Sequence, residues 1–171
     1  MAKVNRGKKF EQVVKQAFEK VPNVSIDRIH DQTTGYKGSQ NICDFIVYRD
    51  PNEFYIECKA VHGTRLPFAN ITDTQWNGLL EKAKIEGVYA GVLCWYIDYD
   101  CTYFFHIDYL AKHKAEGHKS IKCPYLANPE DFSLHKPFEK VPIRGVKKRI
   151  FFNYNMEEFL DAVQFDRWSV D

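Results

Sequence analysis

Glu57 and Lys59 stand two positions apart within EFYIECKA (53–60), a segment whose other residues are mainly aromatic or apolar. The segment predicts a buried strand, and a charged group in such a strand loses hydration free energy unless it has a partner. Side chains two residues apart in a strand point to the same face, so the two charges lie side by side. The pair therefore indicates either an ion pair or a site that handles charged groups.

A third charged residue, Asp44, is expected to join this pair. ICDFIVY (42–48) predicts a preceding strand, and RDPN (49–52) predicts a four-residue turn between the two strands. With that turn, Asp44 directly faces Glu57, with about 5 Å between the Cβ atoms. A turn one residue longer or shorter would place the two carboxylates on opposite faces. The other face is predicted to be the core side, and it carries Cys43, Phe45, Val47, Phe54, Ile56 and Cys58.

These residue types suit metal-dependent chemistry. Two directly opposed carboxylates repel each other, and a divalent cation removes the repulsion. Mg²⁺ is usually bound by one or two carboxylates and keeps sites for water and phosphate oxygens. An ammonium group beside it, here that of Lys59, stabilises charge on a phosphate or orients an attacking water. The three residues favour metal-dependent phosphodiester hydrolysis, and a plain Glu57–Lys59 ion pair is the alternative.

The surrounding pattern predicts the elements that position these residues. A helix is predicted at 5–21, because its apolar residues follow one stripe and Asn5 is a good N-cap. Asn155 likewise opens a last helix at 155–164, with Glu158 at capping-box spacing. Strands are predicted at 24–30, 88–97, 101–107 and 147–154, further helices at 72–87 and 108–117, and an irregular stretch at 118–146. This order predicts one α/β domain, residues 1–171, with a mixed central sheet flanked by helices.

Composition and charge exclude several classes of protein. The chain has 171 residues, a net charge of +1 and 44% hydrophobic residues, which is typical of a globular protein. No apolar run approaches the roughly 20 residues of a membrane helix, and no signal peptide is recognisable, so we expect a cytoplasmic protein without a membrane partner. From Ala111 to Ile150 there are ten Lys or Arg and four Asp or Glu, which fits either a polyanion-binding flank or a solvated basic surface.

The cysteines and the known short motifs offer no competing site. The five cysteines are odd in number and form no C-x-x-C pair, which disfavours a disulfide framework and a zinc ribbon. They are therefore predicted to be reduced and to pack as small apolar residues. The sequence contains no P-loop, dinucleotide fingerprint, H-E-x-x-H or G-x-S-x-G motif.

Four segments of the chain resemble one nuclease family. Asp44, Glu57 and Lys59 match the core hairpin of the PD-(D/E)xK nucleases, and the wider pattern is similar to the RecU-type Holliday junction resolvases. The matching segments are NRGKKFE at the start of the first helix, CDF followed by YIECKA, LPFANITDTQ, and GHKSIK. Together they span the chain from Asn5 to Lys122 in the family's order.

The resemblance implies a restriction-endonuclease-like αβββαβ core, a homodimer, and symmetric nicking of four-way DNA junctions with Mg²⁺ or Mn²⁺. It also implies host or phage recombination proteins as partners. By the same resemblance, Asp44 and Glu57 bind the metal, Gln75 completes the metal site, Lys59 stabilises the transition state, and Glu11 supports the site. The basic residues that would contact DNA phosphates are Lys37, Arg65, Lys119 and Lys122.

The sequence leaves alternatives for these roles. Gln75 stands three residues after Thr72 and so also fits a capping box, whereas Glu11 also fits a solvated helix position. The four basic residues also fit ordinary surface positions. The chain departs from the family at Ile42 and Cys43, where the family has hydroxyl residues, so only a backbone carbonyl is left there as a ligand.

The family's long stalk between its first strands is reduced here to HDQTTGYKGSQN (30–41). The short basic glycine loop around Lys37 is the candidate to replace it, and such a small version suits a phage enzyme. Two other functions stay open: a restriction- or repair-type nuclease acting on ordinary duplex DNA, and a DNA-binding module with a vestigial nuclease hairpin.

Overall fold

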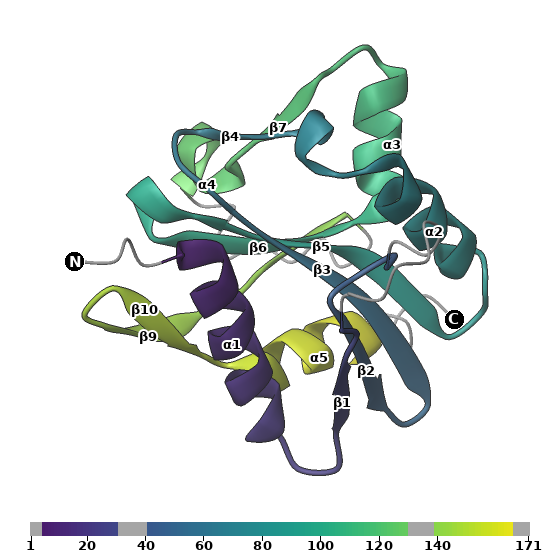
Figure 1. Cartoon of the computed structure of the whole chain (residues 1–171), viewed down its shortest axis with the longest axis vertical. Coiled ribbons are helices and arrows are strands. Elements are labelled where there is room, and N and C mark those ends of the chain that lie inside the picture. The colour runs from purple at the N-terminus through teal and green to yellow at the C-terminus, as the bar shows by residue number, and fades with distance from the viewer. Residues whose placement is uncertain (1–4, 31–40, 130–138, 166–171) are drawn as a thin grey trace.

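A six-stranded mixed sheet with strand order β1-β2-β3-β5-β6-β8 forms the centre of the fold (Figure 1). The computed structural model describes residues 5–30, 41–129 and 139–165. Strands β3 and β5 are parallel, and the other neighbours in this sheet are antiparallel. Two small antiparallel sheets, β4–β7 and β9–β10, lie beside it. The strands are β1 (Ser25–Arg28), β2 (Phe45–Arg49), β3 (Asn52–Val61), β4 (Arg65–Pro67), β5 (Val88–Tyr96), β6 (Cys101–His106), β7 (Ser120–Lys122), β8 (Lys140–Pro142), β9 (Gly145–Lys148) and β10 (Phe151–Tyr154).

Helices cover both faces of this sheet. Phe10 of the first helix and Phe159 of the last belong to one buried cluster, whereas Trp76 and Leu110 belong to a second cluster on the opposite face. The arrangement confirms the predicted α/β fold. The order α1-β1-β2-β3-α2-β5 confirms the predicted αβββαβ core, with β4 of a separate small sheet inserted between β3 and α2. The helices are α1 (Arg6–Glu19), α2 (Asp73–Ala83), α3 (Ile107–Ala115), α4 (Pro124–Ala127) and α5 (Met156–Phe165), with 3₁₀ turns at Phe68–Asn70 and Ile97–Tyr99.

The β2–β3 hairpin has the predicted register, although its turn is shorter than predicted. The ladder runs from the Phe45–Ile56 pair to the Arg49–Asn52 pair, so only two residues form the turn instead of four. Because the extra pair extends both strands equally, every partner assignment stays the same. The predicted register is therefore confirmed from the Phe45–Ile56 pair onward, and Asp44 stands directly before this first pair.

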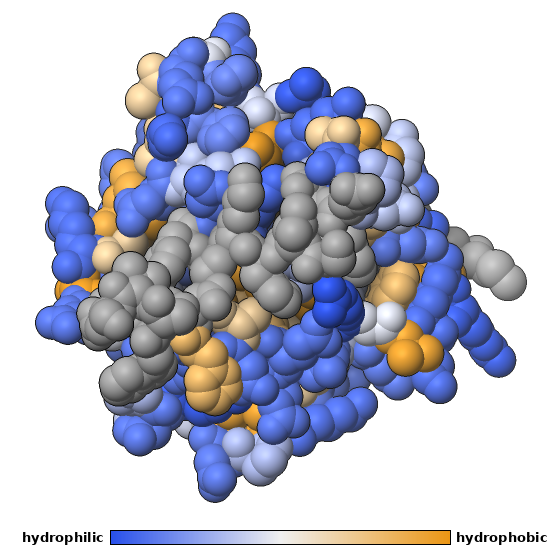
Figure 2. All heavy atoms as spheres, turned by 180° about the vertical axis from the view of Figure 1, so that it is seen from behind, coloured by the Kyte–Doolittle hydropathy of each residue, from blue (hydrophilic) through white to orange (hydrophobic). Residues whose placement is uncertain are grey.

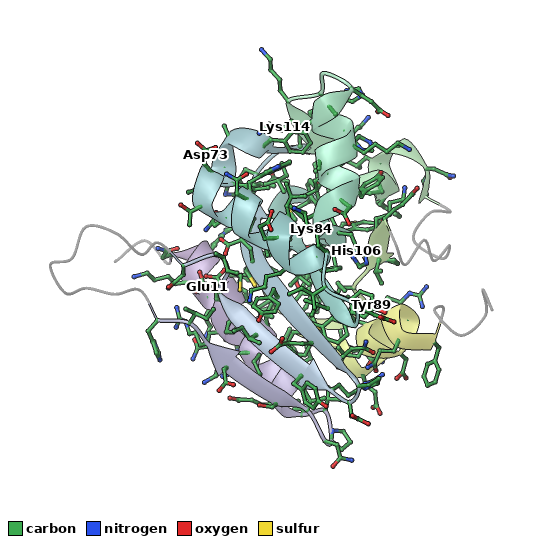
Figure 3. The ribbon with its side chains drawn as sticks, turned by 90° about the vertical axis from the view of Figure 1, so that its right-hand side faces the viewer. Glu11, Asp73, Lys84, Tyr89, His106 and Lys114 are labelled. Atoms are coloured by element: carbon green, nitrogen blue, oxygen red, sulfur yellow. The ribbon has the colours of Figure 1, made fainter. Side chains whose placement is uncertain are left out.

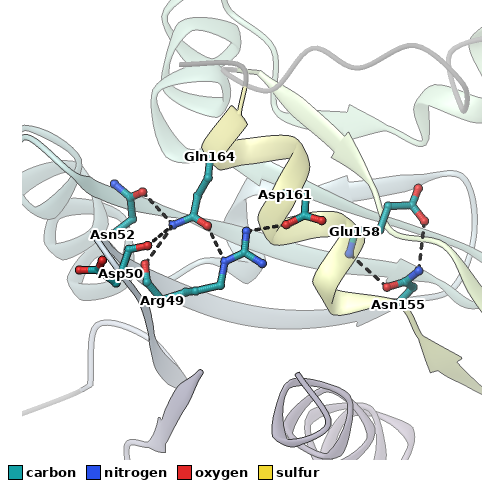
Figure 4. A network of polar contacts seen from close by, with 7 residues as sticks. All are labelled: Arg49, Asp50, Asn52, Asn155, Glu158, Asp161 and Gln164. Carbon is teal, nitrogen blue, oxygen red and sulfur yellow. Dashed lines mark hydrogen bonds and ion pairs between the residues drawn. The ribbon is translucent and has the colours of Figure 1, made fainter. Parts of the chain in front are cut away.

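Helix α5 fixes the far end of this hairpin through a polar network (Figure 4). Arg49 forms an ion pair with Asp161 at 2.7 Å, and its Nε donates to Oε1 of Gln164. The Gln164 amide also donates to Oδ1 of Asn52 at 2.9 Å. Gln164 and Asn52 are both buried, so these bonds satisfy polar groups that water does not reach.

Two predicted helix starts are confirmed. Asn5 Oδ1 accepts from the N–H of Lys8 at 3.2 Å, and Asn155 Oδ1 accepts from the N–H of Glu158 at 3.1 Å. The capping box at Asn155 is half formed, because the Glu158 carboxylate bonds to the Asn155 side chain rather than to its backbone N–H. Each of these capping bonds joins residues only three positions apart, which explains why the helix starts could be predicted from the sequence.

Two predictions of secondary structure are wrong. The stretch 118–146, predicted to be irregular, contains β7, α4 and β8, and β8 is the edge strand beside β6. Strands of three residues are too short to show an alternating pattern. The segment 147–154, predicted as one strand, belongs to the β9–β10 hairpin, which turns at Arg149 with φ of 60°.

The cysteines are buried and free of disulfide bonds, as predicted. The placement of Cys43 on the same face as Phe45 was wrong, because Cys43 packs in the second cluster. The chain enters the β2 ladder only at Phe45, so strand alternation does not extend to Cys43. Burial raises the pKa of the Cys43 thiol to about 12, which keeps it neutral.

Seen from behind, the coloured part of the surface is mostly hydrophilic, with hydrophobic side chains scattered over it (Figure 2). In the described ranges, no helix combines the length and the apolar character needed to cross a membrane.

Candidate active site

Backbone hydrogen bonds hold Asp44 where the chain enters β2. Its N–H donates to the carbonyl of Ile56 at 3.1 Å, and its Oδ2 accepts from the N–H of Cys58 at 2.8 Å. Its carboxyl group lies within hydrogen-bonding reach of that of Glu57. Burial raises the pKa of Asp44, although the Cys58 N–H and the charge of Lys59 oppose this effect. The predicted juxtaposition of the two carboxyl groups is therefore present.

Glu57 is the buried centre of the cluster, with a relative exposure of 4%. Its Oε1 lies 2.8 Å from Nζ of Lys59 and accepts a hydrogen bond from Nε2 of Gln75 at 2.9 Å. Burial, reinforced by the neighbouring Asp44, raises the pKa of Glu57 to about 8 despite the Lys59 charge. A carboxyl group held in such an environment is typical of a functional site.

Gln75 caps its helix, as predicted, and it also bonds to the charged cluster, whereas its role as a metal ligand stays a prediction. Its N–H donates to Oγ1 of Thr72 at 3.2 Å, and its Oε1 accepts from the N–H of Thr72 at 3.0 Å, which completes a capping box. The same Oε1 accepts from Nζ of Lys59 at 3.4 Å. As the side chain stands, its nitrogen faces Glu57, so metal binding through Oε1 would require the amide to rotate.

Glu11 reaches the cluster through an arginine that the sequence reasoning missed. Glu11 comes from α1 (Figure 3), and its Oε2 lies 2.8 Å from Nη2 of Arg28. Burial raises the pKa of Asp44, and the charge of Arg28 is the smallest of the influences that oppose this rise. Arg28 pairs with Phe45, the residue after Asp44. The pairing register of the first strand with β2 would have revealed this neighbour. The alternation of residues in the first strand does not by itself determine that register.

Three of the four predicted DNA-binding residues lie on or beside the β4–β7 ribbon. Arg65 pairs directly with Lys122, and the carbonyl of Lys119 accepts from the N–H of Phe68 at the end of the ribbon. All three basic side chains are exposed. Lys37 lies outside the described residues.

The donor set of Asp44 and Glu57 fits a hard divalent cation. Within the described part of the chain, no group of three or more His, Cys, Asp or Glu side chains forms a metal site. Mg²⁺ does not require one, since it is commonly bound by one or two carboxylates together with water and phosphate oxygens. Glu57 is buried and Asp44 is half-buried, and both have raised pKa values, so a bound cation would strongly stabilise their ionised forms.

Comparison with known proteins gave structural likenesses but no match in sequence. No protein-family model and no curated protein sequence matches the chain. Among solved structures, the chain is similar to Hjc, a Holliday junction resolvase from the archaeal hyperthermophile Archaeoglobus fulgidus. The likeness covers 60% of this chain and 78% of that chain, with 19% sequence identity and a TM-score of 0.45. At this level of similarity, any assignment of function has to be built on the side chains of the site.

Proposed function

We propose that this protein is a Mg²⁺-dependent endodeoxyribonuclease that resolves four-way (Holliday) DNA junctions by symmetric phosphodiester hydrolysis. The observation that carries the proposal is the pair of carboxyl groups of Asp44 and Glu57, held in contact within a largely buried site beside Lys59. This arrangement costs desolvation free energy, and an apolar trio would pack there without that cost. Its oxygen donors and its ammonium group are those that phosphodiester hydrolysis requires.

Asp44 and Glu57 would hold the ion, with Mn²⁺ able to replace Mg²⁺, and Gln75 is a further candidate ligand. When bound, the ion supplies charge that activates water and offsets the negative charge on the phosphate under attack. Lys59 stabilises the developing charge on the phosphate oxygens through its ammonium group. Gln75 orients Lys59 and Glu57 by bonding to both of them. Glu11 positions Arg28, whose charge helps to keep Asp44 ionised.

The β4–β7 ribbon supports DNA as the substrate. Arg65 and Lys122 are directly opposed like charges, which destabilise a strand pair unless an anion lies between or over them. In the described ranges, neither side chain forms an ion pair with a carboxylate. A phosphate backbone along the ribbon would remove this repulsion, and Lys119 would extend the contact.

Resolution of a junction requires two nicks at symmetric positions, so the proposal includes a homodimer with one site in each protomer. Sedimentation equilibrium in low salt tests this part separately. A two-fold dimer also matches the approximate two-fold symmetry of a four-way junction. Host or phage recombination proteins remain proposed partners.

The central test is a nicking assay on a synthetic four-way junction and on linear duplex of the same sequence, with Mg²⁺, Mn²⁺ or EDTA. We expect junction-selective, metal-dependent cleavage by the wild type. Asp44→Asn should bind the junction without cutting it, because the Asn oxygen still accepts from Cys58 while the charge is lost. Nicking by Asp44→Asn at the wild-type rate would refute the assignment. Equal cleavage of both DNAs would favour a duplex nuclease, and binding without metal-dependent heat would favour a vestigial hairpin.

A further inference from the structure

The β9–β10 hairpin is a small sheet of its own that projects from the body of the molecule. Figure 1 shows it extending on the side where α1 begins. Its tip is a run of four exposed residues, Lys147, Lys148, Arg149 and Ile150. The predicted single strand at 147–154 hid this tip, because a hairpin turn at a basic residue has no recognisable turn motif.

The base of the hairpin is firmly packed, so the tip is held in a fixed place. Tyr154 is buried, and its hydroxyl lies 2.9 Å from Oγ1 of Thr102. Phe151 packs against Trp95 with ring centroids 5.6 Å apart. A Cβ added at Gly145 would lie 2.7 Å from the carbonyl oxygen of Asn153, so the two strands approach closely at the base.

The tip combines cations with exposed apolar side chains. Lys147 is paired with Asp100 at 2.6 Å, but Lys148 and Arg149 have no ion pair with any carboxylate in the described ranges. Ile150 is 50% exposed and Val146 is 64% exposed, which leaves apolar surface in water beside two cations that have no ion pair among the described residues. Such a surface is complementary to a partner that offers both negative charge and apolar faces.

A groove joins this tip to the strand that carries the candidate active site. The groove has a volume of about 570 Å³, and Arg6, Ala60, His62, Ile150 and Phe151 are among the residues that line it. Ala60 directly follows Lys59 on β3, so its side chain points to the opposite face of the sheet from Glu57 and Lys59, and the groove runs beside the end of the catalytic strand on that other face. The basic side chain of Arg6 lies on the groove wall, where a phosphate would pass.

We propose that the β9–β10 tip is a DNA-binding finger that selects the branch point of the substrate. Lys148 and Arg149 bind phosphates, and Ile150 packs against base faces that are unstacked where the duplex arms meet. Regular duplex hides its base faces within the stack, so it offers the phosphates but no surface for Ile150. This inference depends on the proposed function and names the structural feature of DNA that the enzyme would recognise.

The test measures DNA binding in the Asp44→Asn background, so that no substrate is cleaved. Fluorescence anisotropy compares a four-way junction with linear duplex of the same sequence over a range of salt concentrations. The charge variant is Lys148→Glu with Arg149→Glu, and its matched control is Lys20→Glu with Lys84→Glu. The two control lysines are exposed and lie at the C-caps of α1 and α2, where Lys84 forms a surface ion pair with Glu81. Thermal melting by circular dichroism confirms that each variant is folded.

We expect the charge variant to bind the junction about tenfold more weakly and to lose about 2 from the slope of log K against log salt. The control pair should keep the junction affinity and slope of the parent. Ile150→Ala should lower the affinity for the junction several-fold relative to linear duplex, with the salt slope unchanged. Its matched control is Ile85→Ala, which should leave the ratio of junction affinity to linear-duplex affinity unchanged. Ile85 is 53% exposed and lies two residues after the end of α2.

The outcomes separate this inference from the proposed function. If the parent binds the junction and the folded hairpin variants bind it equally well, the finger is refuted while the proposed function stands. If the parent binds neither DNA, the proposed function fails, and the finger fails with it. A loss of linear-duplex affinity as large as the loss of junction affinity in Ile150→Ala would refute the role in branch selection.

Discussion

The ammonium group of Lys59 lies 2.8 Å from Oε1 of Glu57, a carboxylate whose side chain is only 5% exposed. The two residues come from one strand, two positions apart, and Gln75 of α2 bonds to both. This trio explains how a strand of apolar character carries two charges. The lysine compensates part of the desolvation cost of the glutamate, and a metal ion would compensate the remainder.

Removal of Lys59 should destabilise the metal-free protein. Above pH 8, where Glu57 is ionised, Lys59→Met leaves this carboxylate buried without its cation, which should cost about 1–3 kcal/mol in the free energy of unfolding. The double variant Glu57→Gln with Lys59→Met should recover part of that loss, because it buries no unpaired charge. Urea denaturation in EDTA measures both values. A Lys59→Met protein as stable as the wild type would show that the pair contributes nothing to folding.

The capping role of Gln75 can be separated from its role in the site. Thr72→Ala removes one capping bond and should cost about 1 kcal/mol, while the contact of Gln75 with Glu57 persists. Gln75→Ala removes both contacts and should lower nicking activity about 10- to 100-fold. Rates of junction nicking, compared at a temperature where both variants are folded, distinguish the two. Equal losses of activity would mean that Gln75 acts only through the helix.

Charge reversal on the β4–β7 ribbon should have opposite effects on stability and on binding. Lys122→Glu turns the like-charged pair with Arg65 into an attractive pair, so the melting temperature should rise slightly. The same change should weaken DNA binding and lower the salt slope by about 1. Thermal melts and anisotropy titrations provide the two readouts, with Lys20→Glu as the control. A variant that binds DNA as the wild type does would remove the ribbon from the interface.

The lowered pKa of Asp98 predicts the direction in which the stability of the fold changes with pH. The Gly63 N–H donates to its carboxylate at 2.6 Å, and His62 lies 2.9 Å from it. These bonds lower the pKa of Asp98 from its ordinary value of 3.8. A carboxyl group whose pKa is lowered by folding stabilises the fold at pH values above its ordinary pKa. This contribution is lost as the pH falls through the lowered pKa.

Asp98→Asn should therefore melt at a lower temperature than the wild type at pH 6, and the gap should close in stronger acid. Melting curves across this range check the expectation. A gap that widens on acidification would contradict the assigned sign.

Several features of the site were predictable from the sequence because they are local. The alternation of apolar residues in 42–48 and 53–60, with a short turn between them, predicted the register that the ladder shows from the Phe45–Ile56 pair onward. The predicted turn length was wrong, yet the register held because both strands gained one residue. The start of α1 at Asn5 and the capping box of α2 also depend only on residues within one helical turn.

Contacts between distant segments were decided only by the tertiary structure. The sequence places Gln75 eighteen residues from Glu57, and only the packing of α2 on the sheet brings its amide to that carboxylate. The Glu11–Arg28 pair, the pairing of β4 with β7, and the projecting β9–β10 hairpin are further examples. Short strands and single ion pairs leave no periodic signal, because their stability comes from partners that the chain meets only after it has folded.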